Sequence, residues 1–364
     1  MNVRIKILLL SIFICILSSC VKTNTSENFE KKTIPWQGID REYLIFLPTS
    51  YISEGEIPLV VGLHGYTGTA SGFEKETTKG MNLHAEYRNY IAVYPQGVNF
   101  WGKTNGMPFF VSSWNDLESN APPREGERPI CINSRGQYPR PKECKEYSHC
   151  AWTGCYDDIG FIKKVIEEVA ENYSVDRSRI YLSGMSNGGA MAHRFACIHP
   201  EILAAAASVS GSIPRDRSCI PTNPISYLQV YGDKDTVTPI NGEVSGDGWF
   251  YEKPEVSFNK WAESMGCSKE LVVADLLTGK NNNLVCNSRS KCDQGKTLEV
   301  TNCLVPDGGH AWPGQKPGVG YCRSEEQSES MPNQNECIDN SGKEINWGNE
   351  LIWEFFSKHR RENV

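Results

Sequence analysis

The sequence has no excess of positive charge, no repeat of fixed period and few histidines. Lysine and arginine total 37 against 44 aspartates and glutamates, which gives a net charge of −7. Without a positive field to hold phosphates, nucleic acid is not an expected partner. The 364 residues are 39% hydrophobic, with 32 glycines and 20 prolines, which is an ordinary globular composition. This excludes a coiled coil and a miniature disulfide-rich fold, and favours one large domain with insertions over two domains.

The first apolar run is too short to cross a membrane. It extends from Ile7 to Leu17 behind two basic residues and ends in small residues. A bilayer-spanning helix needs about 20 apolar residues, so this pattern predicts a secretory signal instead of a transmembrane anchor. Its end, Leu17-Ser18-Ser19-Cys20, resembles the bacterial lipobox, at which cleavage leaves a lipidated cysteine. We expect a signal peptide over 1–19 and a tether over 20–37, with lipidated Cys20 holding an exported protein at the periplasmic face of a membrane or at the cell surface.

The cysteines lack the close C-x2-C spacing of a zinc site. Once Cys15 and Cys20 are set aside, the 14 cysteines leave an even number, as a disulfide framework requires. Export favours disulfides, and we expect neither a metal nor a cofactor. Sequence order suggests four groups: Cys131, Cys144, Cys150 and Cys155; Cys197 with Cys219; Cys267, Cys286, Cys292 and Cys303; and Cys322 with Cys337.

Short apolar runs alternate with segments of helical periodicity over most of the chain. This order predicts an α/β fold with a mostly parallel sheet covered by helices on both faces, over residues 38–364. Two polar stretches, about 116–154 and 323–343, interrupt the alternation and are expected to be disulfide-tied insertions; a calcium site is an alternative for the acidic second one. Strands are expected at 42–47, 59–63, 91–94, 180–183, 205–209, 225–231 and 298–304, and helices at 158–173, 187–198 and 347–359.

The hexapeptide Gly184-Met185-Ser186-Asn187-Gly188-Gly189 carries the strongest chemical signal. A G-x-S-x-G match alone is weak, because this glycine and serine content produces one by chance in roughly a quarter of such chains. Here an expected strand runs into the motif and an expected helix follows it, which is the context of a nucleophile elbow. The alternative is a glycine-rich turn without chemistry.

A nucleophilic serine needs a histidine to take its proton and an acid to orient that histidine. Of the seven histidines, only His310 lies in a glycine-containing loop after a late strand. The acid is expected after the strand 225–231, where Asp235 is preferred, Asp233 is the alternative and Asp307 is a distant third. The order serine, aspartate, histidine is that of α/β-hydrolases.

An oxyanion hole completes such a site. One amide is expected from Asn187, directly after the nucleophile, and the other from the loop after an early strand, where we choose Tyr66. His64 in the same loop, together with Trp114 and Trp312, is a candidate for lining the substrate cleft; His64 could instead brace the loop, and each tryptophan could equally belong to the core.

Several blocks resemble those of the polyhydroxybutyrate depolymerase-like esterase family, which also includes feruloyl and acetylxylan esterases. The blocks are Leu63-His64-Gly65, Ser113-Trp114-Asn115, Asp157-Asp158-Ile159-Gly160-Phe161, the elbow hexapeptide, Gly232–Pro239 and Gly309–Gly314. The resemblance implies an α/β-hydrolase fold with Ser186, Asp235 and His310 as the triad. The chain departs from fungal feruloyl esterases and tannases, which place cysteines beside the serine and the histidine, where Met185 and Ala311 stand here.

The expected function is therefore that of a lipid-anchored serine esterase. Its substrate would be a hydroxyalkanoate polyester or oligomer, or a feruloylated or acetylated polysaccharide. A serine peptidase or a thioesterase would use the same triad, and a catalytically silent binding lipoprotein would keep the fold without needing all three residues.

Overall fold

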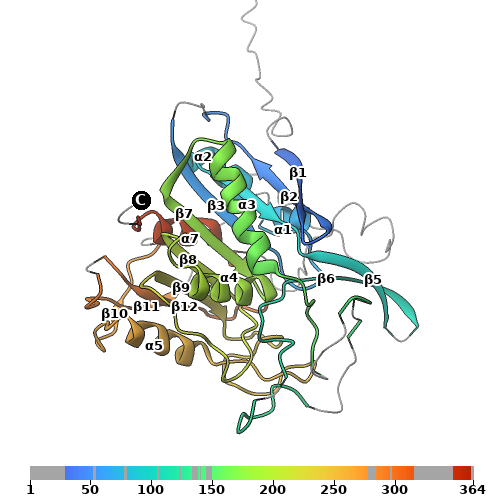
Figure 1. Ribbon diagram of the computed structural model, residues 1–364. Coiled ribbons are helices and arrows are strands. Elements are labelled where there is room, and N and C mark those ends of the chain that lie inside the picture. The colour runs from blue at the N-terminus through green and yellow to red at the C-terminus, as the bar shows by residue number, and fades with distance from the viewer. Residues whose placement is uncertain are drawn as a thin grey trace, which may run out of the picture.

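A computed structural model defines most of the chain (Figure 1). It describes residues 29–51, 55–77, 80–104, 106–122, 124–132, 138–139, 141–144, 150–277, 284–295, 297–314 and 347–361. The predicted signal peptide, Cys20, His149, Cys322, Cys337 and the 323–343 insertion lie outside the described residues. No helix within the described ranges is long and apolar enough to cross a membrane.

The core of the fold is a ten-stranded mixed sheet in the order β1-β2-β4-β3-β7-β8-β9-β12-β11-β10. The neighbours from β4 to β12 pair in parallel, and the strands at both edges pair antiparallel. The strands are β1 (Phe29–Trp36), β2 (Ile39–Phe46), β3 (Ile57–Leu63), β4 (Ile91–Pro95), β7 (Val175–Met185), β8 (Ala205–Val209), β9 (Ser226–Gly232), β10 (Val272–Val273), β11 (Val285–Arg289) and β12 (Val300–Val305). Strands β3, β4 and β8 are buried along their whole length, as expected for parallel strands covered on both faces.

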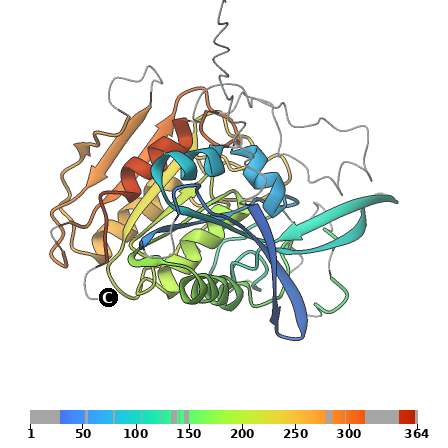
Figure 2. The ribbon, with the colours of Figure 1, turned by 90° about the horizontal axis from the view of Figure 1, so that it is seen from above.

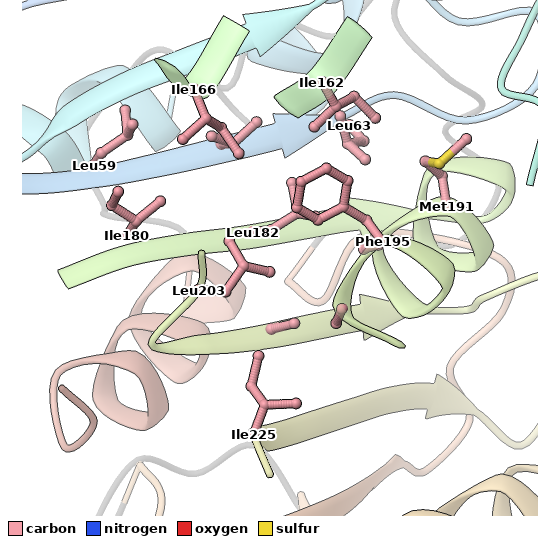
Figure 3. Close-up of a cluster of buried hydrophobic side chains, with 14 of the residues drawn as sticks. Leu59, Leu63, Ile162, Ile166, Ile180, Leu182, Met191, Phe195, Leu203 and Ile225 are labelled. Carbon is pink, nitrogen blue, oxygen red and sulfur yellow. The ribbon is translucent and has the colours of Figure 1, made fainter. Parts of the chain in front are cut away.

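Helices cover both faces of this sheet, as Figures 1 and 2 show. Helices α3 (Asp158–Asn172), α4 (Asn187–Ile198) and α5 (Pro254–Ser264) pack on one face. Helices α1 (Ala70–Glu76), α2 (Gly80–Arg88) and α7 (Trp347–Phe356) pack on the other. Figure 3 shows the first layer, where Ile162 and Ile166 of α3 and Phe195 of α4 lie over Leu182 of β7.

The predicted α/β class is confirmed, and each expected strand and helix overlaps an observed one. The start of α3 also follows the sequence, because the Asp157 carboxylate accepts a hydrogen bond from the Gly160 amide at 2.9 Å and caps the helix. The next residue, Asp158, does not cap the helix but is fully buried and ion-paired with Arg41 at 2.6 Å. This pair fixes α3 against β2.

Two strand regions differ from the sequence expectation. Residues 29–36 are not a tether, because β1 pairs with β2 along its full length and forms the edge of the sheet. Residues 98–113 form a separate hairpin of β5 (Val98–Thr104) and β6 (Met107–Ser113), which extends from the body in both views (Figures 1 and 2). Strand β1 has a single buried residue, and β6 changes from exposed at Met107 to buried at Ser113. Neither segment has the strict alternation of polar and apolar residues by which a strand is recognised in a sequence.

The disulfides follow the predicted groups. Two lie inside the first insertion, Cys131–Cys150 and Cys144–Cys155. Cys197 pairs with Cys219, and the third group divides into Cys267–Cys292 and Cys286–Cys303. These bonds fit an extracytoplasmic location.

Candidate active site

Ser186 lies in a strained turn between β7 and α4. Its backbone has φ 55° and ψ −118°, a conformation that costs energy for a residue with a Cβ. The turn is tight, since a Cβ on Gly184 would lie 2.2 Å from the Gly188 carbonyl oxygen. The flanking glycines are therefore required by close backbone contact, as expected for a nucleophile elbow.

His310 and Asp235 meet at the same edge of the sheet. The His310 Nδ1 atom lies 2.8 Å from Asp235 Oδ2, and the Asp235 side chain is completely buried. Asp235 also accepts hydrogen bonds from the Thr238 amide at 2.8 Å and from the Thr238 hydroxyl at 2.7 Å. Burial alone would raise the pKa of Asp235, but the bonds from His310 and Thr238 outweigh it and keep the pKa below its usual value. The carboxyl group is thus held ionised to orient an imidazole.

The three candidate residues follow strands from one part of the sheet. Ser186 follows β7, Asp235 follows β9 and His310 follows β12. In the sheet, β9 and β12 are adjacent, and β8 separates them from β7. The carboxyl ends of parallel strands form one edge, which is where such folds place their sites. Within the described residues, the Ser186 hydroxyl bonds to the Ser212 hydroxyl at 3.2 Å and not to His310.

Ser212 is a neighbour that the sequence did not reveal. It lies in the loop after β8, and its amide donates a hydrogen bond to the Ser186 carbonyl at 3.1 Å. The same loop also contacts Thr238, which is bonded to Asp235. The Thr238 hydroxyl lies 3.4 Å from the Ser210 carbonyl oxygen and 3.3 Å from His310 Nδ1. The loop therefore joins the serine half of the site to the aspartate–histidine half.

The expected oxyanion residues flank Ser186. Asn187 is the first residue of α4, where amides point away from the helix without intrahelical partners. The loop that carries Tyr66 lies against the serine, because a Cβ on Gly65 would be 3.3 Å from Ser186 Cβ. The assignment of the two amides stays a prediction.

The three cleft candidates are buried, which agrees with the alternatives in which the tryptophans belong to the core and His64 braces its loop. His64, Trp114 and Trp312 have side chains that are 0% exposed. The Trp114 indole donates to the His64 carbonyl at 2.8 Å, and the Trp312 indole donates to Asn349 at 3.0 Å and packs edge-on against Phe73. Trp312 borders a cavity of about 40 Å³ beside the His310 loop, but Ser186 is absent from its lining. All three rings are therefore packed inside the fold.

His64 braces the loop after β3. Its Nδ1 lies 2.8 Å from the Gly65 carbonyl oxygen and its Nε2 accepts from the Gly97 amide at 3.0 Å. Burial lowers the pKa of His64 to about 4, so the ring is neutral near pH 7 and suited to accepting that bond.

The block Ser113-Trp114-Asn115 connects the surroundings of the elbow. The Asn187 side chain accepts from the Trp114 amide at 2.6 Å and donates to the Trp114 carbonyl at 3.0 Å. The Asn115 amide donates to the buried Asp158 at 2.7 Å, so the same three residues also reach α3. This block supports the site from behind instead of lining it.

Another group of potential metal ligands has a structural role. His193, Cys197 and Cys219 lie close together, but the two sulfur atoms form a disulfide. His193 Nδ1 lies 3.0 Å from the Tyr227 hydroxyl and its Nε2 accepts from the Cys219 amide at 3.2 Å. The chemistry of this donor set does not fit a metal.

The fold and the elbow define the class of the protein as an α/β-hydrolase. Residues 153–246 match the family model described as phospholipase/carboxylesterase. The chain is 32% identical over 270 residues to "Putative esterase NocK" of Nocardia uniformis subsp. tsuyamanensis, covering 71% of this chain and 66% of that protein. It is 30% identical over 175 residues to "Feruloyl esterase B" of Piromyces equi, covering 46% of this chain and 31% of the relative. The chain therefore spans less than two thirds of the length of these two relatives, and it is similar to esterases over the parts that match.

A solved acetyl xylan esterase from Aspergillus awamori is among the similar structures. The TM-score is 0.47 at 14% identity, with 78% of this chain and 95% of that chain covered. A thermostable esterase gives a TM-score of 0.48 at 17% identity, covering 93% of this chain and 64% of that chain.

Proposed function

We propose that the chain is an exported serine esterase that cleaves carboxylic esters through an acyl-enzyme. The observation that carries this proposal is the bond between His310 and the buried Asp235 at the sheet edge where the strained Ser186 stands. The family-model match over residues 153–246 and the similarity to esterase relatives support the same reaction class.

The proposed mechanism gives each group one role. The Ser186 hydroxyl turns from Ser212 toward His310, loses its proton to that ring and attacks the ester carbonyl. Asp235 holds the ring and stabilises the imidazolium that forms. The amides of Asn187 and Tyr66 hold the negative oxygen. His310 then returns the proton to the leaving alcohol, and water releases the acid by the same steps in reverse.

The substrate is proposed to be an acylated polysaccharide or a polyester of hydroxy acids. Similarity to a feruloyl esterase favours the acylated polysaccharide. The insertion is a part of this chain that could give it a different substrate preference from that relative. The aromatic cluster of Trp152, Trp249 and Tyr251 packs against the partly buried Tyr66, so the insertion reaches the loop beside Ser186. We also propose lipid attachment at Cys20, which would keep the enzyme at a membrane surface.

A substrate panel tests the esterase proposal. p-Nitrophenyl acetate, butyrate and octanoate, methyl ferulate and hydroxybutyrate oligomers would be assayed with the exported chain, beside a peptide and a thioester. Replacing Ser186 by alanine should lower kcat/KM by roughly 10⁴ to 10⁶ on the preferred ester. The matched Ser212→Ala variant removes the neighbouring hydroxyl and should lose far less.

Two results would redirect the proposal. Equal rates for the unmodified chain and Ser186→Ala on every ester would refute it and leave a binding lipoprotein. Faster turnover of the peptide or the thioester than of any ester would instead identify the protein as a peptidase or a thioesterase that uses the same triad.

A further inference from the structure

A cavity of about 340 Å³ opens on the side of the sheet that α1 covers. It lies between the edge strand β1 with its neighbour β2, the start of α1 and the base of the β5–β6 hairpin. Its volume falls within the range of small-molecule sites. Its lining residues include Lys31, Glu42, Thr69, Ser71, Gln96 and Asn99. Ser186, Asp235 and His310 are not among them, so it is separate from the candidate active site.

The charges around this cavity are balanced. Two lysines and two glutamates line it, and one such pair, Lys31 with Glu42, is in contact at 2.7 Å. A lining without net charge gives no field that would select a phosphate or a carboxylate ligand. The other polar side chains include Thr69, Ser71, Gln96 and Asn99. Thr69 caps α1, and both amide atoms of Gln96 are already hydrogen-bonded within the wall, so the Ser71 hydroxyl and the Asn99 amide are the groups offered to a ligand. This composition suits a neutral ligand that is rich in hydroxyl groups.

An exposed aromatic ring continues the cavity along the hairpin. Successive side chains of a strand point to opposite faces, so Trp101 shares the face of Asn99, about 7 Å further along β5. Trp101 is 47% exposed and packs edge-on against its cross-strand partner Phe110, with ring centroids 5.4 Å apart. The hairpin that carries it extends from the body in Figures 1 and 2. A half-exposed indole offers an apolar plane on which the C–H face of a sugar ring can stack.

The inner wall of the cavity is joined to the loop beside the nucleophile. Gln96 accepts a hydrogen bond from the Ala70 amide at 2.9 Å and donates to the Ser112 hydroxyl at 3.0 Å. Its Nε2 also lies 3.3 Å from Nε2 of His64, which braces the loop containing Gly65. Gln96 and His64 therefore connect the wall of the cavity to the loop on which Tyr66 is expected to supply an amide.

We propose that this cavity and Trp101 together form a binding subsite for a neutral oligosaccharide chain, separate from the ester-cleaving site. Sugar hydroxyls would bond to the charge-balanced, amide- and hydroxyl-bearing wall, and one ring would stack on the indole. The subsite goes beyond ester hydrolysis and does not require it. A polysaccharide held there would keep its acyl groups near Ser186 between successive cleavages.

Calorimetric titration of the full exported chain carrying Ser186→Ala tests this subsite, because that variant cannot consume an ester. The probes are xylohexaose and cellohexaose, with a hexamer of galacturonate as the acidic comparison. Ser71→Trp should fill the cavity and weaken binding of the neutral hexamers at least about tenfold. Trp101→Ala should weaken it by roughly 2- to 12-fold, the loss of one stacking contact.

Met107→Ala is the matched control. Met107 is 68% exposed on the same hairpin, and its register opposite Thr104 places it on the face away from Trp101. Its loss should leave the affinity unchanged. The proposal is overturned by absent binding of both neutral hexamers, by equal or tighter binding of the acidic hexamer, or by affinities that neither Ser71→Trp nor Trp101→Ala alters. Hydrolysis of p-nitrophenyl acetate by the unmodified chain tests the esterase independently, so the two failures are distinguishable.

Discussion

Replacing Gly188 by alanine should lower both activity and stability, because a steric clash with the backbone outweighs the gain in helix propensity. Gly188 is the second residue of α4, and alanine in a helix is favoured over glycine by about 1 kcal/mol. On that ground alone the variant would be more stable. The added Cβ would, however, lie 2.3 Å from the Leu63 carbonyl oxygen and 2.5 Å from that of His64.

Both contacts are to backbone, so no rotamer change can relieve them. Ordinary Cβ contacts begin near 3.4 Å, so the start of α4 and the loop after β3 must separate by roughly an ångström. Overpacking of this kind costs about 1–3 kcal/mol, which exceeds the helix gain. The same displacement would separate the amides of Asn187 and Tyr66, and misplacement by about 1 Å can cost 10²-fold in rate.

The assay is kcat/KM on p-nitrophenyl acetate together with thermal unfolding. We expect Gly188→Ala to lose about 10²-fold in kcat/KM and to melt a few degrees lower. Gly246→Ala is the control, since a Cβ there meets no atom within 4 Å. If Gly188→Ala melted at a higher temperature and kept its rate, this prediction would be refuted. The close contact between the loop after β3 and the start of α4 would then not explain the glycine at position 188.

Three further outcomes follow from the same contacts. Asp235→Asn should lower kcat/KM by about 10⁴ while Asp233→Asn changes it little, and equal losses would contradict the assignment of the acid. His64 binds its proton at a pKa of about 4 in the fold against 6.5 in the unfolded chain, so stability present above pH 6.5 should be lost as pH falls toward 4, by on the order of 3 kcal/mol. His64→Gln should remove that part of the loss from a series of melting curves, and an unchanged pH slope would refute it. Replacing Cys131 and Cys150 by alanine should lower kcat/KM more than the same change at Cys267 and Cys292, a control bond that closes a loop of similar length away from Tyr66. Equal effects of the two changes would show that the insertion does not contribute to catalysis.

The sheet centre could be predicted from the sequence because its strands are buried on both faces. Short continuous runs such as Leu59–Leu63 and Ala205–Val209, which carry no charged residue, are typical of parallel strands covered on both faces, and both are buried along their whole length. The edge strand β1 has one fully buried residue, Ile34, among charged neighbours, and so resembled a polar linker. Its pairing with β2 depends on a partner that local polarity does not reveal.

The chemistry of the site was predictable where backbone geometry demands a residue type, and less so where packing decides. Glycines at 184 and 188 leave room that a nucleophile elbow needs, and Ser186, Asp235 and His310 each follow a parallel strand in the same part of the sheet. Tryptophans beside turns carry no such constraint. An indole can line a cleft or fill a core, and nothing in the sequence indicated that Trp114 would be used to donate to the His64 carbonyl.

Under the proposed function, the insertion is the part of the molecule in which sequence changes would alter substrate preference without disturbing the proposed triad. Arg217, almost fully buried, donates to the Glu118 and Ala121 carbonyls at 2.7 and 3.1 Å and pairs with Glu127 at 2.8 Å, which anchors the start of the insertion to the loop after β8. The far end is anchored by the aromatic contact of Trp152 with Tyr66, whose ring centroids are 5.0 Å apart. Both anchors reach segments that border Ser186, one through Ser212 and one through Gly65. Sequence changes between the anchors would therefore alter what meets the substrate, while the strained turn and the Asp235–His310 pair, set by the sheet, stay in place.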